Sequence, residues 1–181
     1  MDAVNRQVEA LFQRDSAVEK GLEKESRSAY LQSSYIDKWA GFPLYQNTQT
    51  KYYSCGEEMF PDMLEALRGA KHFIFLEYFI IEEGYMFNTI LDILEEKAKA
   101  GVDVRFIYDD VGSINSISFG YYKKLQERGI PCVTFNPFKP LISVVMNNRD
   151  HRKIFVVDGY IGFTGGINLA DEYINKVKRF G

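Results

Sequence analysis

The stretch KIFVVDGYIGFT, at residues 153–164, determines much of the architecture expected for this chain. It contains two short runs, 153–157 and 160–164, that are rich in the β-branched and aromatic residues typical of strands. Only Asp158 and Gly159 separate the two runs. An Asp-Gly pair in this position favours a tight hairpin turn, because both residues tolerate a positive φ. The pattern therefore predicts two antiparallel strands.

Upstream of this hairpin, helical and strand-like segments alternate along the chain. Apolar residues recur at helical spacing in three segments, 57–69, 87–100 and 121–128. Strand-like runs occupy 51–54, 72–81, 102–108 and 131–135. Strands that alternate with helices imply crossover connections between parallel strands. We therefore expect a mixed α/β fold, in which helices flank a largely parallel central sheet that also contains the antiparallel hairpin.

The composition indicates one folded unit. A chain of 181 residues, 46% apolar and 15% aromatic, is long enough for one ordinary hydrophobic core. Residues 1–39 are expected to form an exposed helical or linker region, and residues 40–181 the folded domain, which ends without a cap as if truncated. Trp39, Phe42 and Tyr45 are interpreted as packing residues rather than as lipid contacts.

Charge and cysteine content argue against several classes of function. Lys and Arg number 22 against 25 Asp and Glu, and the formal charge of −3 argues against a nucleic-acid partner. Cys55 and Cys132 match no zinc spacing and are interpreted as buried thiols in a reducing compartment. No carboxylates or histidines have the spacing of metal ligands, so we expect no metal and no other cofactor. The apolar run 73–81 is too short to span a bilayer, and the chain alone is expected to be soluble.

Two residues with reactive side chains stand at the start of the first hairpin strand. His151 and Lys153 are two positions apart, so both should point to the same face of the strand. There an imidazole can attack or exchange protons near neutral pH, and an ammonium can hold negative charge. Gly165 and Gly166 would let backbone N–H groups approach an anion, and the amide of Asn168 can donate to it. These five residues are the candidates for one phosphate-binding site.

Other polar residues have both a functional and a structural explanation. Glu77 interrupts an apolar strand, where a carboxylate either needs a partner or faces solvent. Asp109 and Asp110 end a predicted strand, at the edge where open α/β sheets bind ligands, or act as turn residues. Asp158 is explained equally well by its turn and by direct chemistry. His72, the other histidine, is interpreted as a packing residue.

The spacing His-x-Lys-x4-Asp-x6-Gly-Gly-x-Asn, which runs from His151 to Asn168, resembles the signature of the phospholipase D superfamily. Chance agreement at six such positions is expected on the order of once in 10⁸ starting positions. The resemblance extends over roughly residues 40–181 and is specific for bacterial cardiolipin synthases in four stretches, 75–79, 108–113, 149–153 and 162–173. It marks the domain as the first catalytic half of such an enzyme.

The resemblance implies roles for the candidate residues. Those implied to be catalytic are His151, Lys153 and Asp158. Those implied to bind phosphate are Lys153, Gly165, Gly166 and Asn168. Those implied to support the site are Glu77, Asp109 and Arg149. In the family an acidic residue that orients the histidine follows soon after the asparagine, and Asp171 and Glu172 are the nearest candidates here.

The resemblance also implies a reaction, in which the histidine attacks one phosphatidylglycerol, glycerol leaves, and a second phosphatidylglycerol resolves the phosphohistidine to give cardiolipin. A second motif copy, in the rest of a full-length chain or in a homodimer partner, supplies the other histidine. Positioned acid–base groups contribute about 10²- to 10⁴-fold in rate, so this single-motif chain is expected to be inactive or weakly active alone. The full-length enzyme is expected at the cytoplasmic face of the bacterial cell membrane.

Two alternatives are left open by the sequence. Two identical chains can bring their single motifs together across a two-fold interface, as in a homodimeric phosphodiesterase or nuclease. An inactive fragment that keeps the fold and binds anions is the other alternative.

Overall fold

The structure is a computed structural model that describes residues 12, 14–138 and 147–178. The chain divides into two compact units, Met1–Tyr52 and Tyr53–Gly181, which we call unit 1 and unit 2. The division falls after Tyr52, whereas the sequence placed a boundary after residue 39. No described helix has the length and apolar character needed to cross a membrane.

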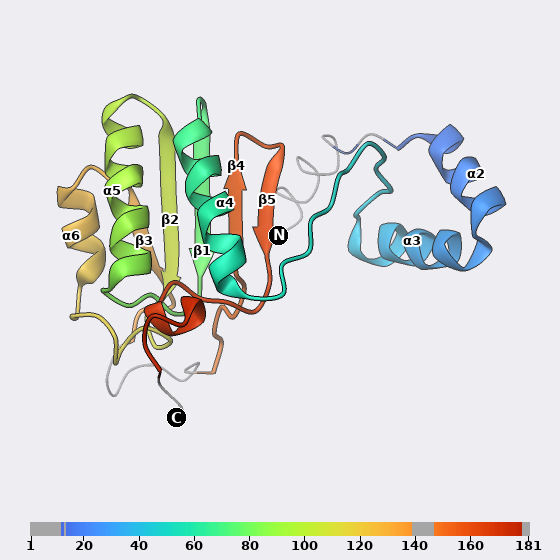
Figure 1. The fold of residues 1–181 in the computed structure, drawn as a ribbon. Helices are drawn as coiled ribbons and strands as arrows, with labels where there is room; N and C mark the ends of the chain where they lie inside the picture. The colour runs from blue at the N-terminus through green and yellow to red at the C-terminus, as the bar shows by residue number, and fades with distance from the viewer. Residues whose placement is uncertain (1–11, 13, 139–146, 179–181) are drawn as a thin grey trace. The chain divides into compact units, whose positions relative to one another are not determined.

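The described part of unit 1 contains the helices α2 (Ser16–Glu25) and α3 (Arg27–Ala40) (Figure 1). The side chain of Ser26 accepts a hydrogen bond from the N–H of Ala29 and so caps α3, a role that short polar side chains favour. Arg14 binds the carboxylate of Asp37 through a fork of hydrogen bonds 2.8–3.1 Å long.

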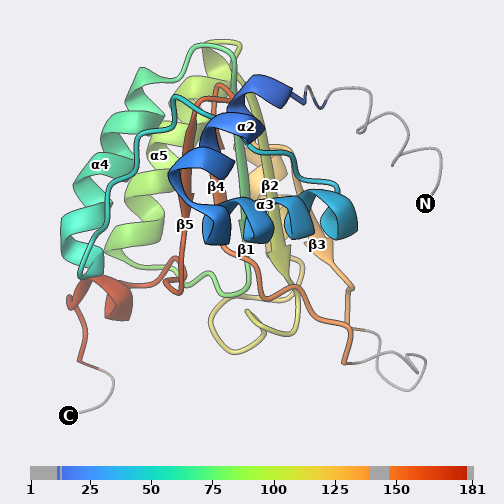
Figure 2. The same cartoon turned by 90° about the vertical axis from the view of Figure 1, so that its right-hand side faces the viewer.

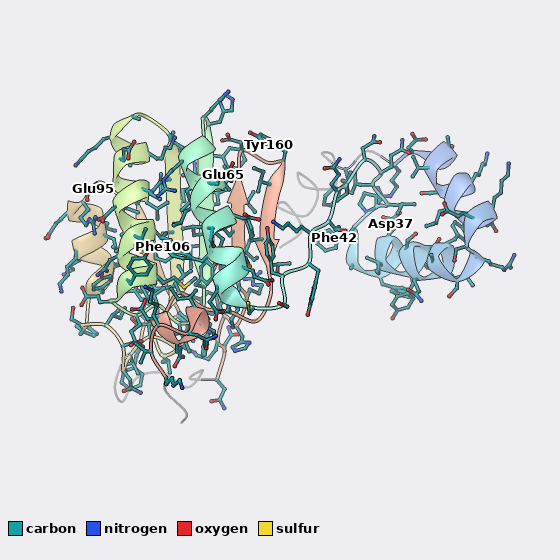
Figure 3. The ribbon with its side chains drawn as sticks, viewed as in Figure 1. Asp37, Phe42, Glu65, Glu95, Phe106 and Tyr160 are labelled. Carbon is teal, nitrogen blue, oxygen red and sulfur yellow. The ribbon has the colours of Figure 1, made fainter. Side chains whose placement is uncertain are left out.

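The three aromatic residues interpreted as packing residues are exposed. The exposed fractions of Trp39, Phe42 and Tyr45 are 69%, 60% and 56%, so that interpretation is wrong. Neither α2 nor α3 contains a buried residue, because two short helices cannot enclose a core of their own. Phe42, labelled in Figure 3, does contact another ring, that of Phe12, at a centroid distance of 5.9 Å.

Unit 2 is built on a five-stranded sheet with the order β3-β2-β1-β4-β5. The strands are β1 (Phe73–Tyr78), β2 (Asp103–Asp109), β3 (Cys132–Phe135), β4 (Ile154–Val157) and β5 (Ile161–Thr164). β1, β2 and β3 run parallel, and β4 and β5 add to β1 as an antiparallel hairpin. The prediction of a mixed, largely parallel sheet flanked by helices is thus confirmed.

The hairpin turn has the backbone that its sequence requires. Asp158 and Gly159 have φ values of 53° and 78°, as expected of the central residues of a tight hairpin turn. Tyr160 follows them, and Figure 3 shows it at the end of the sheet opposite to the short helix η1 (Asp171–Ile174). The expected strand at 51–54 is not formed, because Ser54 gives its N–H and its hydroxyl to the carboxylate of Glu58 rather than to a neighbouring strand.

Helices α4 (Gly56–Gly69) and α5 (Tyr85–Lys99) cover one face of the sheet, as Figures 1 and 2 show. Their apolar residues recur at helical spacing and meet alternate residues of the strands, so one core forms between the two layers. Phe106 of β2, labelled in Figure 3, lies 5.9 Å from Phe87 of α5 between ring centroids. Helix α6 (Tyr121–Glu127) packs against β3.

Two residues expected inside the core lie at its surface. Cys132 is buried, as predicted, but Cys55 is exposed just before α4, so the interpretation as two buried thiols is wrong for Cys55. His72 is exposed at the start of β1, and its interpretation as a packing residue is also wrong. Both lie at the end of an element, outside the apolar pattern that fills the core.

Candidate functional site

Topology brings the two reactive residues to the carboxyl end of β1. Because β4 runs antiparallel to β1, residues that precede β4 lie beside those that follow β1. The ring of His151 lies 4.7 Å from the ring of Phe79, centroid to centroid, at an interplanar angle of 59°. The ammonium of Lys153 lies 5.2 Å from the centroid of the same ring. One aromatic side chain thus contacts both candidates, although His151 itself is exposed.

Lys153 is a buried cation, with only 6% of its surface exposed. Its Nζ donates a 2.8 Å hydrogen bond to the carbonyl oxygen of His151, and it makes no ion pair of 4.0 Å or less with a carboxylate of the described residues. Burial lowers the pKa of Lys153, and the more distant charge of Asp150 acts in the opposite direction. A positive charge held in this way is suited to pair with an anion that the chain itself does not provide.

The two glycines after β5 lie beside open space. Gly165 and Gly166 are both exposed, and a Cβ added to either would contact no atom within 4 Å. Neither residue has a positive φ. The fold therefore does not require glycine at these two positions, in contrast to Gly112, where a Cβ would overlap the carbonyl oxygen of Phe79. The open space leaves room for a ligand to approach the backbone at both positions.

Asn168 is held by the fold more firmly than the sequence suggested. It is buried, its Oδ1 accepts a 3.0 Å hydrogen bond from the N–H of Ile80, and its Nδ2 donates to the hydroxyl of Tyr173 at 2.8 Å. The N–H of the next residue, Leu169, donates a 3.2 Å hydrogen bond to the carbonyl oxygen of Ile80. Asn168 thus ties the segment after Gly166 to the residues after β1, and the second N–H of its amide is left to donate to a ligand.

Asp109 organises the segment that leads into His151. It is fully buried and accepts hydrogen bonds from the N–H of Gly112 at 2.8 Å, the N–H of Asp150 at 2.9 Å and the guanidinium of Arg149 at 3.2 Å. Arg149 also donates to the carbonyl of Asn136, at 2.9 Å. Several donors compensate the burial of this carboxylate. The supporting residues Asp109 and Arg149 are therefore in contact with each other and with the backbone beside His151.

Glu77 contacts the same segment through Arg152 and Asp150, two residues that the sequence did not identify as part of the site. Its Oε1 lies 2.7 Å from Nε of Arg152, and the same Nε donates to Oδ1 of Asp150 at 2.9 Å. Asp150 and Arg152 flank His151 in the sequence. The available signal was the cluster of charged residues from 149 to 153 together with a lone glutamate in an apolar strand, but such a cluster also fits a solvated strand end.

Asp158 lies at the other end of β4 from His151 and Lys153. Its carboxylate accepts hydrogen bonds from the N–H groups of Lys71, His72 and Phe73, at 2.8–2.9 Å. Burial alone would raise the pKa of Asp158, but these hydrogen bonds outweigh it and lower the pKa. Of the two explanations offered by the sequence, the contacts support the structural one: Asp158 fastens the hairpin turn to the start of β1.

Asp171, a candidate for orienting His151, instead binds the N-terminus of α5. Its two carboxylate oxygens accept hydrogen bonds from the N–H groups of Tyr85 and Met86, at 2.8 and 2.7 Å, in the first turn of α5. A carboxylate at a helix N-terminus satisfies donors that have no partner within the helix. In the described part of the chain no three or more His, Cys, Asp or Glu side chains are grouped so that they could hold a metal ion.

The arrangement can hold an anion and present an imidazole to it. A buried ammonium, an exposed imidazole on the same aromatic ring and a glycine pair beside open space all come from segments at the carboxyl edge of the sheet. This is the edge at which open α/β sheets bind their ligands.

Comparison with known proteins identifies the family of the domain. The family model described as "Cardiolipin synthase, PLD-like domain" matches residues 63–178. A protein from Streptococcus mutans that has no assigned function is 44% identical over 174 residues, which cover 96% of this chain and 38% of that protein. The cardiolipin synthase of Alkalihalophilus pseudofirmus is 44% identical over 140 residues, which cover 77% of this chain and 28% of the synthase.

The matched region is only part of these relatives. The chain spans between about a quarter and two fifths of the length of the curated relatives it matches. Among solved structures, the phospholipase D family member Nuc from Salmonella typhimurium superimposes with a TM-score of 0.51 at 24% identity, covering 65% of this chain and 68% of Nuc. That similarity supports the fold.

Proposed function

Because the chain belongs to the family of cardiolipin synthase, phospholipase D-like domains, we propose that it supplies one half of a phosphodiester-transfer site with His151 and Lys153 at its centre. The observation that carries this proposal is the contact of both side chains with the ring of Phe79, at the carboxyl edge of the sheet. Their spacing is that of the family signature.

The proposed substrate is phosphatidylglycerol, in keeping with the names of the relatives. A nitrogen of the His151 imidazole forms a bond to phosphorus as the bond to the glycerol oxygen breaks, and the departing glycerol takes up a proton. The hydroxyl of a second phosphatidylglycerol then attacks phosphorus, loses its proton and releases the imidazole. Two molecules of phosphatidylglycerol thus yield one cardiolipin and one glycerol.

Lys153 and the backbone of Gly165 and Gly166 are proposed to hold the phosphate oxygens. Negative charge on the non-bridging oxygens is stabilised most where donors are fixed in advance and water is scarce. Lys153 meets that condition because it is buried and anchored to the carbonyl of His151. Asn168 would contribute its free amide proton and fix the position of the glycine segment. Asp158 would contribute only through the fold.

The acid–base partner is proposed to come from a second motif. The 181 residues contain one copy of the signature, and two histidines are needed if one attacks while the other moves protons. The second copy would come from the rest of a longer chain or from an identical chain across a two-fold axis. The membrane surface, where phosphatidylglycerol resides, would be the place of action.

A chimaera tests the proposal without requiring activity from the isolated chain. The part of this chain that matches the Alkalihalophilus pseudofirmus cardiolipin synthase, 44% identical over 140 residues, would replace the corresponding region of that synthase. We expect the chimaera to form cardiolipin and glycerol from phosphatidylglycerol, and His151→Ala to abolish the product. His72→Ala is the matched control, because His72 lies at the other end of β1 and should leave turnover unchanged.

The same assays separate the alternatives. Cardiolipin formation that survives His151→Ala, or a folded chimaera that is inactive while the parent synthase works, would contradict the proposal. Shortening of single- or double-stranded DNA by the isolated chain would favour the homodimeric nuclease. A folded monomer that turns over neither DNA nor phosphatidylglycerol in any context would favour the inactive fragment.

A further inference from the structure

Glu77 occupies an apolar position in the sheet with an incompletely satisfied carboxyl group. In the strand register it lies between Ile107 of β2 and Ile154 of β4. Its side chain is 19% exposed, and its Oε1 is a buried atom without a hydrogen-bond partner among the described residues. Arg152 Nε approaches this oxygen to 2.7 Å but gives its hydrogen bond to Asp150. Two carboxyl groups therefore lie at one N–H group.

The charges around this cluster do not balance if both acids are ionised. Asp150, whose side chain is 4% exposed, and Glu77 share the single cation Arg152. Of the other charged groups nearby, Lys153 attracts Asp150 but directs its ammonium to the ring of Phe79. Asp109 is paired with Arg149 and accepts from the N–H of Asp150. Two negative charges on largely buried carboxyl groups that share one cation favour the uptake of one proton.

The two carboxyl groups respond in opposite directions, as expected of a pair that shares a proton. Burial, a hydrogen bond with Asp150 and the charge of Asp150 raise the pKa of Glu77 to about 7, while the charge of Arg152 lowers it. Burial alone would raise the pKa of Asp150, but hydrogen bonds with Glu77 and Arg152 outweigh it and lower the pKa. Glu77 is therefore the partner that carries the proton, and Asp150 the one that accepts.

The pair is connected to His151 through a turn of the backbone. Oδ1 of Asp150 accepts from the N–H of Arg152 at 3.2 Å, a side-chain-to-backbone contact that spans His151. The N–H of Asp150 is itself held by Asp109, at 2.9 Å. The backbone N–H groups of Asp150 and Arg152, on either side of His151, are thus both held by carboxylates. The side chain of Asp150 is linked to Glu77 of β1 through Arg152.

We propose that Glu77 is a positioning residue for His151: it shares one proton with Asp150, and the protonated pair, together with Arg152, fixes the turn that places the imidazole on Phe79. When the proton is lost, two carboxylates face one guanidinium and the turn loosens. The inference deepens the proposed function, on which it rests only for the statement that His151 is the reacting group.

Nuclear magnetic resonance on the ¹³C,¹⁵N-labelled chain tests this directly. Measured in a His151→Ala background, which removes the neighbouring imidazole, the carboxyl carbon of Glu77 should titrate with a midpoint near pH 7, and the backbone amides of residue 151 and of Arg152 should show an inflection at the same pH. Glu77→Gln keeps the shape and a hydrogen-bond donor but cannot titrate, so the inflection should vanish from both amides. Glu65→Gln is the matched control, because Glu65 is exposed on α4, and it should leave the inflection in place (Figure 3).

Two results would overturn the inference. One is a Glu77 carboxyl that titrates near the ordinary value of 4.5, and the other is an inflection that persists in folded Glu77→Gln. Should Glu77→Gln not fold, Asp150→Asn provides an independent test. Removal of the second carboxylate should move the Glu77 midpoint to lower pH, and an unchanged midpoint would contradict a shared proton.

The experiment is independent of turnover. An inactive chimaera would remove the proposed function and leave the shared proton as a structural feature. A normal Glu77 titration in a chain whose chimaera is active would remove only the positioning role. In the active chimaera, Glu77→Gln should alter the pH profile of kcat within about one unit on either side of the Glu77 midpoint, from about pH 6 to about pH 8. A simple loss of stability would lower kcat without changing the shape of this profile.

Discussion

At the scale of single residues, the main contrast is between Lys153 and Glu77. Both are ionisable side chains in poorly hydrated positions, and burial opposes the charged form of each. Glu77 lies beside a second carboxylate and can respond by holding a proton. Lys153 donates to the carbonyl of His151, and its proposed counter-ion is an anion from outside the chain.

The raised pKa of Glu77 predicts how stability depends on pH. Because the folded pKa, about 7, exceeds the ordinary 4.5, the stability that the protonated carboxyl contributes is complete below 4.5 and is lost as pH rises through 7. Solvent screening of this partly exposed group should limit the loss to about 1 kcal/mol. Glu77→Gln should not show this loss in urea unfolding between pH 4.5 and 7, with Glu65→Gln as control. Parallel plots of the free energy of unfolding against pH for the wild type and Glu77→Gln would contradict this prediction.

Residue spacing predicted part of the candidate site but not its network. His151 and Lys153 could be identified because both fall at a fixed spacing within one short segment, which ends immediately before β4. The hydrogen bond from the N–H of Ile80 to the side chain of Asn168 could not be predicted, because the two residues are 88 positions apart in the sequence. The coupling of Glu77 to Asp150 depends likewise on the register between β1 and the start of β4. Such contacts are set by topology rather than by local sequence.

At the scale of elements, the turn and loop glycines divide into those that the fold needs and those that it does not. Gly165→Ala and Gly166→Ala should change the free energy of unfolding by less than about 1 kcal/mol, because the added Cβ meets open space. If the pair serves ligand approach, each variant should weaken binding of inorganic phosphate several-fold. Unchanged phosphate affinity in both variants would assign these glycines no part in the site.

Gly112→Ala is the contrasting variant. Its Cβ would overlap the carbonyl of Phe79, so the loop after β2 must shift, and we expect a loss of about 2–4 kcal/mol in denaturant unfolding. A stability equal to that of Gly165→Ala would show that this loop is not packed against Phe79 as described.

The β4–β5 hairpin makes a separate prediction for Asp158. Asp158→Ala removes acceptors from three N–H groups and places alanine at a φ of 53°, so the unfolding midpoint should fall by several degrees at neutral pH. Because the folded pKa is lowered, this contribution is present above 3.8 and is lost as pH falls through the lower folded value, so the two proteins should converge in acid. Phosphate affinity of the folded variant should be unchanged. A selective loss of affinity would assign Asp158 to the chemistry instead.

Element type was predictable wherever the apolar period was long, as in α4, α5 and the first two strands of the sheet. The expected strand at 51–54 failed, because side-chain capping by Glu58 competed with strand pairing, a choice that four residues cannot reveal. The aromatic residues after α3 were misjudged for a related reason. Composition indicates what packs well but not whether a neighbouring surface is present.

At the scale of the whole molecule, the described residues of unit 2 contain one sheet, one core and one candidate half-site. The candidate half-site has a buried ammonium and an exposed imidazole on one aromatic ring, and the other histidine, His72, lies away from it at the start of β1. The proposed chemistry would therefore need a second motif. The family relationship and the geometry thus lead to the same expectation of two halves.

Binding of inorganic phosphate, followed through the ring resonances of the two histidines, tests the central claim most directly. We predict a saturable shift of the His151 ring, little change at His72, and binding about tenfold or more weaker in Lys153→Met, since one charge-assisted contact is lost. Equal, non-saturating shifts at both histidines, or full phosphate affinity in folded Lys153→Met, would contradict the claim that His151 and Lys153 serve one anion.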